Sequence, residues 1–307
     1  MFKILLALIL IWSPVAMADV INMEFKFTPY VGDPQKSSQV DTVPGNAKVF
    51  INNVLLAEQV VREEKVPVLF EERDISAAVW VPVHSLGAVL RKGKNTIRFE
   101  FVPANATKAY NARLAWLSVM DKSTEKSEGG RYEATNQSGA GQEDKKVEGK
   151  VVLQREFVAD FATDLPWHHY PPVTTLSDED KKSLALLVKK RSDLFKPNFA
   201  ELYLILGKNP NMNLAELKKL KCLDKAYAAG IRIIPPSQNQ LNFATTGNPE
   251  VVVSRVDAAP LFPLVEKSFA RIKGEDIQMC AGMALSVAFP PRLTCVRSPS
   301  GDWQVAY

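Results

Sequence analysis

Alternating apolar and polar residues indicate that the first third of the chain is rich in β-strands. Residues 23–27 read Met-Glu-Phe-Lys-Phe, with the period of two expected of a strand that has one buried face. The same period places Ile97, Phe99 and Phe101 on one face of a strand at 96–101. Many short strands separated by turn residues predict an antiparallel β-sandwich over residues 19–120. Further strands are predicted at 48–51, 78–81 and 112–120, with turns at 52–53 and 91–95.

The second half of the chain shows helical periodicity followed by strand patterns. Ser177 is expected to cap a helix together with Asp180, and its apolar spacing continues to Phe195, before Pro197. Helices followed by antiparallel strands predict an α+β domain over residues 148–307. The expected fold class is therefore mainly β with α+β. The other predicted elements are helices at 199–206 and 213–229, strands at 151–161, 231–234, 241–245, 250–256 and 303–306, and a hairpin of 283–289 with 292–297.

A polar segment separates the two predicted domains. Within residues 121–147, Tyr132 and Val147 are the only large apolar residues, and Gly, Ser, Glu and Lys dominate. Such a composition buries too little apolar surface to offset the entropy lost on ordering. We therefore predict a flexible linker or a long exposed loop.

The first 18 residues have the pattern of a secretory signal peptide. Lys3 provides the positive charge, a short apolar run follows at 4–12, and Ala16-Met17-Ala18 forms a cleavage motif. Cleavage is predicted after Ala18, and the short charged region favours export to a bacterial periplasm. An uncleaved membrane anchor is the alternative. No later stretch reaches the length of a transmembrane helix.

Composition and cysteine content narrow the class of protein. The 307 residues are 46% hydrophobic and 23% charged, with a net charge of only +4, so no strong positive field favours nucleic acid as a partner. Three cysteines in an exported chain predict one disulfide and one free thiol. Spacing does not determine the pairing. We favour Cys222 with Cys280, which precedes a predicted strand, and we expect Cys295 to be a buried free thiol.

Part of the N-terminal region resembles a known domain family. Residues 49–54 read Val-Phe-Ile-Asn-Asn-Val, residues 81–83 read Val-Pro-Val before Leu86, and residues 90–97 read Leu-Arg-Lys-Gly-Lys-Asn-Thr-Ile. These segments resemble the galactose-binding-like jelly-roll accessory domains, although Asn53 stands where that family usually has Gly. The resemblance implies a jelly-roll sandwich and, as is common in that family, carbohydrate binding.

The C-terminal region resembles a second family more distantly. Its order of helices before an antiparallel sheet, and its closing Gly301-Asp302-Trp303 strand, are similar to the cystatin-like, nuclear-transport-factor-like cone fold. This resemblance implies an α+β cone and no particular activity.

The segment Trp167-His168-His169-Tyr170 carries the most suggestive local chemistry. It lies between Pro166 and Pro171-Pro172, and His84 is the only other histidine. A metal site would need His84 or a carboxylate such as Asp160 or Asp164, because neighbouring histidines in an extended chain point to opposite faces. Acid–base catalysis by one histidine, packing in an interdomain seam, and a rigid aromatic surface that binds sugars or protein partners are the other interpretations.

No familiar catalytic motif accompanies these residues. The chain has no phosphate-binding glycine loop, nucleophile elbow, H-E-x-x-H or C-x-x-C pattern. We therefore expect no metal or cofactor, and a non-catalytic binding or accessory role in the bacterial envelope, with carbohydrate or an envelope protein as partner. The alternative is a periplasmic hydrolase that acts on glycans or another envelope substrate.

Overall fold

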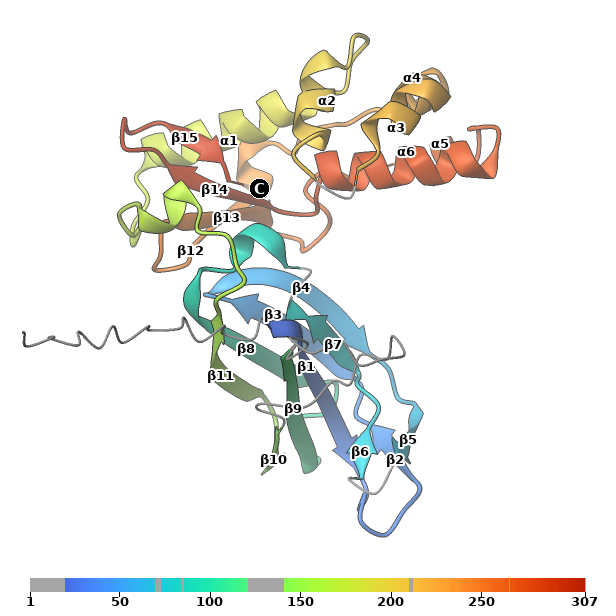
Figure 1. The fold of residues 1–307 in the computed structure, drawn as a ribbon, viewed down its shortest axis with the longest axis vertical. Helices are drawn as coiled ribbons and strands as arrows, with labels where there is room; N and C mark the ends of the chain where they lie inside the picture. Colours follow the sequence, from blue (N-terminus) through green and yellow to red (C-terminus); the bar gives the residue numbers. More distant parts are fainter. Residues whose placement is uncertain are drawn as a thin grey trace, which may run out of the picture. The chain divides into compact units, whose positions relative to one another are not determined.

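The computed structural model describes residues 20–69, 73–83, 86–120, 141–209, 212–264 and 266–306. The predicted signal peptide, His84 and the larger part of the polar segment lie outside these ranges. The described chain is mainly β, with three antiparallel sheets and a helical region near the C-terminus (Figure 1). The predicted fold class is confirmed. Within these ranges, none of the helices has the length and apolar character needed to cross a membrane.

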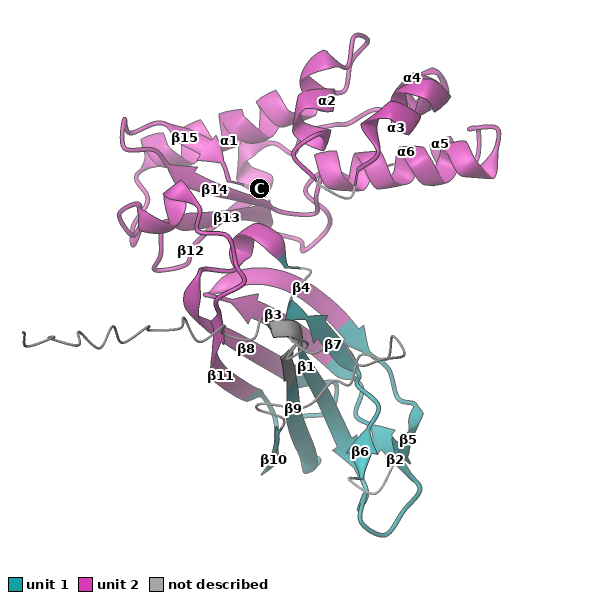
Figure 2. Cartoon of the chain, viewed as in Figure 1, with its two compact units in different colours: residues 1–45, 60–86, 102–151 teal, residues 46–59, 87–101, 152–307 magenta. Residues whose placement is uncertain are grey.

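The chain forms two compact units, each assembled from separate stretches of sequence (Figure 2). Unit 1 comprises residues 1–45, 60–86 and 102–151, and unit 2 comprises residues 46–59, 87–101 and 152–307. Unit 2 therefore contains the C-terminal region together with parts of the predicted β-sandwich.

A seven-stranded sheet is built around β1 in unit 1, in the order β10-β9-β1-β2-β5-β6, with β7 also paired to β1. Phe25 and Phe27 of β1 are fully buried, as their alternation with polar residues predicted. The strands are β1 Val20–Val31, β2 Gln39–Thr42, β5 Lys65–Leu69, β6 Asp74–Ile75, β7 Val79–Pro82, β9 Tyr110–Met120 and β10 Gly141–Val147.

Strand β10 corrects the prediction for part of the polar segment. Residues 141–147 were expected to belong to a linker or loop, but they pair with β9 at the edge of the sheet. An edge strand is held by main-chain hydrogen bonds on one side, so it needs few apolar side chains. Asp144 adds side-chain contacts, since it accepts hydrogen bonds from Arg113 Nε at 2.9 Å and from the Tyr30 hydroxyl at 3.0 Å.

A four-stranded sheet of order β11-β8-β3-β4 contributes most of its residues to unit 2. Its strands are β3 Gly45–Ile51, β4 Val54–Val61, β8 Gly93–Pro103 and β11 Val151–Ala159. Ile97, Phe99 and Phe101 of β8 are fully buried, which confirms the predicted face. The predicted turn between β3 and β4 is formed by Asn52 and Asn53, both in the left-handed region with φ of 50° and 65°.

The C-terminal part of unit 2 packs helices against a sheet of order β12-β13-β14-β15. Helix α1 begins as predicted, because the Ser177 hydroxyl accepts a hydrogen bond from the Asp180 amide and the Asp180 carboxylate accepts one from the Ser177 amide. The strands are β12 Leu241–Thr245, β13 Glu250–Arg255, β14 Leu293–Arg297 and β15 Trp303–Val305. The helices are α1 Asp178–Ser192, α2 Ala200–Leu206, α3 Leu214–Leu220, α4 Cys222–Ala228, α5 Glu266–Phe269 and α6 Glu275–Ala288, with short 3-10 helices η2 Gly87–Val89, η3 Pro166–His169 and η4 Gln238–Gln240.

Three predictions in this region are wrong. Residues 283–289 do not form one arm of a hairpin, since residues 275–288 form α6. Its residues Ala281, Ala284, Leu285 and Ala288 are fully buried, and their spacing of three and four is that of a helix face. The helix predicted at 213–229 is divided into α3 and α4 by Lys221, which is left-handed with φ of 54°. Residues 231–234 form no strand.

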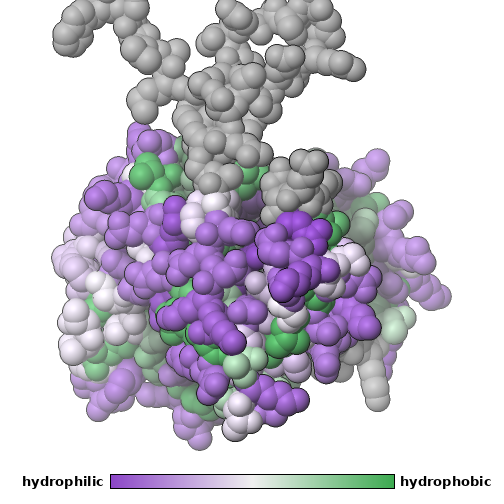
Figure 3. Space-filling model, turned by 90° about the horizontal axis from the view of Figure 1, so that it is seen from below, coloured by the Kyte–Doolittle hydropathy of each residue, from purple (hydrophilic) through white to green (hydrophobic). Residues whose placement is uncertain are grey.

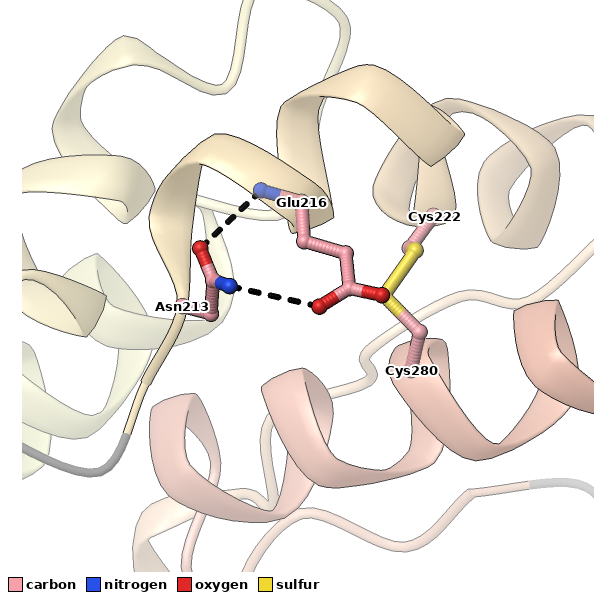
Figure 4. Close-up of a disulfide and its surroundings, with 4 residues drawn as sticks. All are labelled: Asn213, Glu216, Cys222 and Cys280. Atoms are coloured by element: carbon pink, nitrogen blue, oxygen red, sulfur yellow. Dashed lines mark hydrogen bonds between the residues drawn. A yellow bond between two sulfur atoms is a disulfide. The ribbon is translucent and has the colours of Figure 1, made fainter.

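The predicted disulfide between Cys222 and Cys280 is present, with 6.0 Å between the two Cα atoms (Figure 4). It joins the first residue of α4 to the middle of α6, which lies alongside α3 and α4. Cys280 is therefore helical and does not precede a strand. Cys295 is the buried free thiol that was predicted, and burial raises its pKa to about 12.

Candidate functional site

The segment around His168 and His169 forms a short 3-10 helix and not the extended chain that its flanking prolines suggested. Residues 166–169 form η3, in which the His168 amide donates to the Leu165 carbonyl at 2.9 Å. The turn sends the two histidines into different surroundings. His168 is only 7% exposed, whereas the side chain of His169 is 69% exposed.

Both ring nitrogens of His168 are occupied by main-chain groups. Nδ1 accepts a hydrogen bond from the Leu165 amide at 3.3 Å, and Nε2 donates to the Ala88 carbonyl at 3.1 Å. An amide can only donate and a carbonyl can only accept, so the two partners select the neutral tautomer protonated at Nε2. Burial lowers the pKa of His168. The ring therefore has no free nitrogen for acid–base chemistry or for a metal.

Arg91 connects this turn to the C-terminal sheet. Its Nη1 donates to the His168 carbonyl at 2.7 Å, and its Nη2 lies 2.9 Å from both carboxylate oxygens of Glu250 on β13. The Glu250 side chain is 2% exposed, and a charge buried to this extent needs a paired partner, which Arg91 provides.

Four asparagines extend these contacts within unit 2. Asn95 accepts a hydrogen bond from the Arg91 amide at 2.8 Å and donates to the Arg91 carbonyl at 2.7 Å. Asn53 donates to the Thr246 carbonyl at 3.1 Å, and Asn248 donates to the Asn52 carbonyl at 2.8 Å. We call the whole set the polar seam. It consists of Asn52, Asn53, Arg91, Asn95, His168, Thr246, Asn248 and Glu250.

Asn53 supplies one contact of the polar seam from a turn that needs left-handed backbone, with φ of 65°. Asparagine tolerates the left-handed conformation better than other non-glycine residues. Unlike glycine, it also has a carboxamide, which reaches Thr246 beside β12. The turn between β3 and β4 is thus hydrogen-bonded to the loop between β12 and β13.

The other predicted residues of this segment are more exposed than His168. Trp167 is half-buried, with its ring edge-on to that of His168 at 5.7 Å, and among the described residues its enclosed Nε1 has no hydrogen-bond partner. Tyr170 is also half-buried. His169 Nε2 lies 2.8 Å from Asp164 Oδ1 in an exposed pair. Within the predicted site, His168 is therefore buried, whereas His169 and its partner Asp164 are exposed.

The part of the chain that the structure describes contains no set of side chains that could bind a metal ion. No group of three or more His, Cys, Asp or Glu side chains gathers there in a way that could hold an ion. Asp164, one of the carboxylates considered for such a site, lies 3.9 Å from His168 Nδ1, which already accepts the Leu165 amide.

Two hollows on the surface of unit 2 lie apart from the predicted site residues. One, of about 570 Å³, is lined by Lys181, Gln238, Asn239, Leu241, Asn242 and Phe243. The other, of about 470 Å³, lies beside α2 and α3, with Tyr203, Leu204 and Lys218 in its lining. Neither contains a histidine or a carboxylate pair that would suggest catalysis.

A cluster of side chains in unit 1 was missed by the sequence analysis. Trp80 of β7 is 56% exposed, and its Nε1 donates to Glu24 Oε2 at 2.8 Å. Lys26 Nζ lies 2.9 Å from Glu24 Oε1 and 3.9 Å from Asp74 Oδ2. We call these four residues the Trp80 cluster. Alternation in Val79-Trp80-Val81 contained the signal, because two buried valines turn the residue between them outward.

The surface seen in Figure 3 is largely hydrophilic where it is described, with hydrophobic residues scattered among polar ones.

Comparisons of the chain with known protein families, curated proteins and solved structures give no match. The two family resemblances therefore remain predictions, and a functional proposal must rest on the chemistry of the residues themselves.

Proposed function

We propose that the protein is exported to the bacterial envelope and has a non-catalytic binding or accessory role there, with carbohydrate or an envelope protein as its partner. The observation that carries the proposal is the state of His168. Both of its ring nitrogens and its carbonyl are used in contacts within unit 2, so the most suggestive polar residue of the chain serves the fold.

The cysteines support export. A disulfide between two helices, with the third thiol buried, suits an oxidising compartment, in which an exposed free thiol would be a liability. Export is tested by separating periplasmic and membrane fractions of a bacterial host and measuring the intact mass. A soluble protein that begins at Asp19 is expected. A membrane-bound protein that retains residues 1–18 would contradict the proposal.

A periplasmic hydrolase is the second candidate, and one contact favours it. The exposed pair of His169 and Asp164, 2.8 Å apart, has the geometry of a base and its orienting carboxylate. Incubation of the mature protein with purified envelope glycans and peptides, followed by mass spectrometry of released products, separates the two functions. We expect no turnover. Turnover that disappears in His169→Ala would overturn the binding role.

A further inference from the structure

Trp80 is a large aromatic side chain on the outer face of β7, and it is 56% exposed. Its neighbours Val79 and Val81 are buried, so Trp80 lies on the opposite face of β7 and leaves more than half of its surface in water. An exposed position of an antiparallel strand usually carries a polar residue. The indole therefore suggests a use outside the core.

The position of the indole is fixed by its neighbours. In the sheet, Trp80 pairs directly with Lys26, and its Nε1 donates to Glu24 at 2.8 Å. Glu24 is itself buried and is held by Lys26 at 2.9 Å. An aromatic ring already ordered in this way loses little entropy when it binds a ligand.

Charged groups border the exposed ring. Glu24 and Lys26 lie on β1, and Asp74 on β6 lies 3.9 Å from the Lys26 ammonium. Both Glu24 oxygens are engaged by Trp80 and Lys26, so the groups beside the ring that remain open to a ligand are the Asp74 carboxylate, as an acceptor, and the Lys26 ammonium, as a donor. Two carboxylates and one ammonium leave one net negative charge.

We infer that the Trp80 cluster is a binding site for a neutral glycan, with one pyranose ring stacked on the Trp80 indole. A pyranose has an apolar C–H face and a rim of hydroxyls, which matches an apolar ring bordered by the Asp74 acceptor and the Lys26 donor. A protein partner would have to bury the partly exposed Lys26 and Asp74 and compensate their charges. The net negative charge disfavours uronic acids. This inference rests on the proposed binding role and specifies its carbohydrate partner.

Affinity electrophoresis of the mature protein in gels that contain a single polysaccharide tests the inference. The probes are mixed-linkage β-glucan, mannan, dextran and soluble peptidoglycan strands, with polygalacturonate as the acidic comparison. At least one neutral glycan is expected to retard the wild type. Trp80→Ala should weaken that binding by about tenfold or more, whereas Trp80→Phe, which keeps an aromatic ring, should lose less. Leu204→Ala, at an exposed apolar residue of α2, is the matched control and should bind as the wild type does.

The opposite results are equally informative. Equal binding by the wild type and Trp80→Ala, no binding to any neutral glycan, preference for polygalacturonate, or a protein ligand lost in Trp80→Ala would each overturn the glycan site. None of these results overturns the proposed binding role, which fails instead if turnover dependent on His169 is observed. Thermal unfolding of each variant confirms that it is folded.

Discussion

Arg91 and Glu250 form a buried ion pair across a separation of 159 residues, with Arg91 Nη2 at 2.9 Å from both carboxylate oxygens. The pair ties the turn that precedes β8 to the first residue of β13. Because the guanidinium also donates to the carbonyl of His168, one side chain connects three parts of unit 2 that are distant in sequence.

Removal of this arginine should destabilise unit 2 strongly. Arg91→Ala leaves the Glu250 carboxylate buried without its partner, which should cost about 3–5 kcal/mol of unfolding free energy. Urea unfolding followed by circular dichroism measures the loss. Lys36→Ala, which removes an exposed pair with Asp33, is the control and should have little effect. A loss for Arg91→Ala as small as that of the control would mean that water reaches Glu250.

Stability should depend on the titration of His168. Burial places the pKa of His168 in the folded protein below the value of about 6.5 in the unfolded chain. Below that pH the unfolded chain binds a proton that the folded protein does not, so the contribution is complete above pH 6.5 and is lost as the pH falls through the folded pKa. Urea unfolding at pH 7.5 and pH 5 should show the decrease.

Two variants isolate the histidine responsible. His168→Gln retains a donor for the Ala88 carbonyl but does not titrate, so the difference in stability between pH 7.5 and pH 5 should shrink. His169→Ala, at the exposed neighbour, should leave that difference unchanged. If only His169→Ala flattens the pH dependence, the assignment to His168 is wrong.

The enclosed indole nitrogen of Trp167 gives a prediction that separates packing from binding. Trp167→Phe removes a buried donor that has no partner among the described residues, and burying such a donor costs about 1–3 kcal/mol. The substitution also removes some ring area. Stability should stay constant or rise by up to about 1 kcal/mol in urea unfolding. Trp167→Ala should instead lose about 2–3 kcal/mol, because the half-buried ring packs edge-on against His168. Loss of a ligand without loss of stability in Trp167→Ala would favour the binding interpretation.

Trp303 is the matched control for that experiment. Its Nε1 donates to Asp180 Oδ1 at 3.0 Å, so Trp303→Phe should cost about 1–2 kcal/mol. Burial alone would raise the pKa of Asp180, but hydrogen bonds from Trp303, Ser177 and Arg297 lower it to about 2. The same variant should therefore raise the pKa of Asp180, which NMR titration of the carboxyl carbon would detect.

The disulfide should contribute about 2–5 kcal/mol, since it closes a long loop in the unfolded chain. The double variant Cys222→Ser with Cys280→Ser should unfold at correspondingly lower urea concentration. Thiol counting on the unfolded, unreduced wild type should give one free group, and on the folded protein none, because Cys295 is buried and its pKa is raised. Three reactive groups after unfolding would refute the disulfide.

Local patterns predicted those elements whose signals are local. The cap of α1 by Ser177 and Asp180 and the buried face of β8 are each encoded within a few residues, and both are as predicted. Helix α6 was missed because its apolar residues run almost without interruption, so periodicity did not separate a helix from a strand. Strand β10 was missed because pairing with β9, and not its own composition, determines its conformation.

The candidate site was less predictable, because its contacts span long stretches of chain. The histidine pair was visible in the sequence, yet the partners of His168 include Ala88, 80 residues away. The Trp80 cluster likewise depends on the register between β1 and β7, which places Lys26 opposite Trp80. No spacing rule within the sequence reports such a register.

Unit 2 is built from stretches that lie far apart in the sequence, so it can fold completely only after its last stretch has been synthesised. Its residues 46–59 and 87–101 are synthesised well before residues 152–307, yet the side chains of Arg91 and Asn53 form hydrogen bonds to Glu250 and Thr246 in the later stretch. Contacts of such long range form late and slowly, because the intervening chain must first be closed into a loop. Until β13 has been synthesised, the Arg91 guanidinium has no carboxylate of Glu250 to bind. A shortened chain that ends before β13 would lack this ion pair permanently.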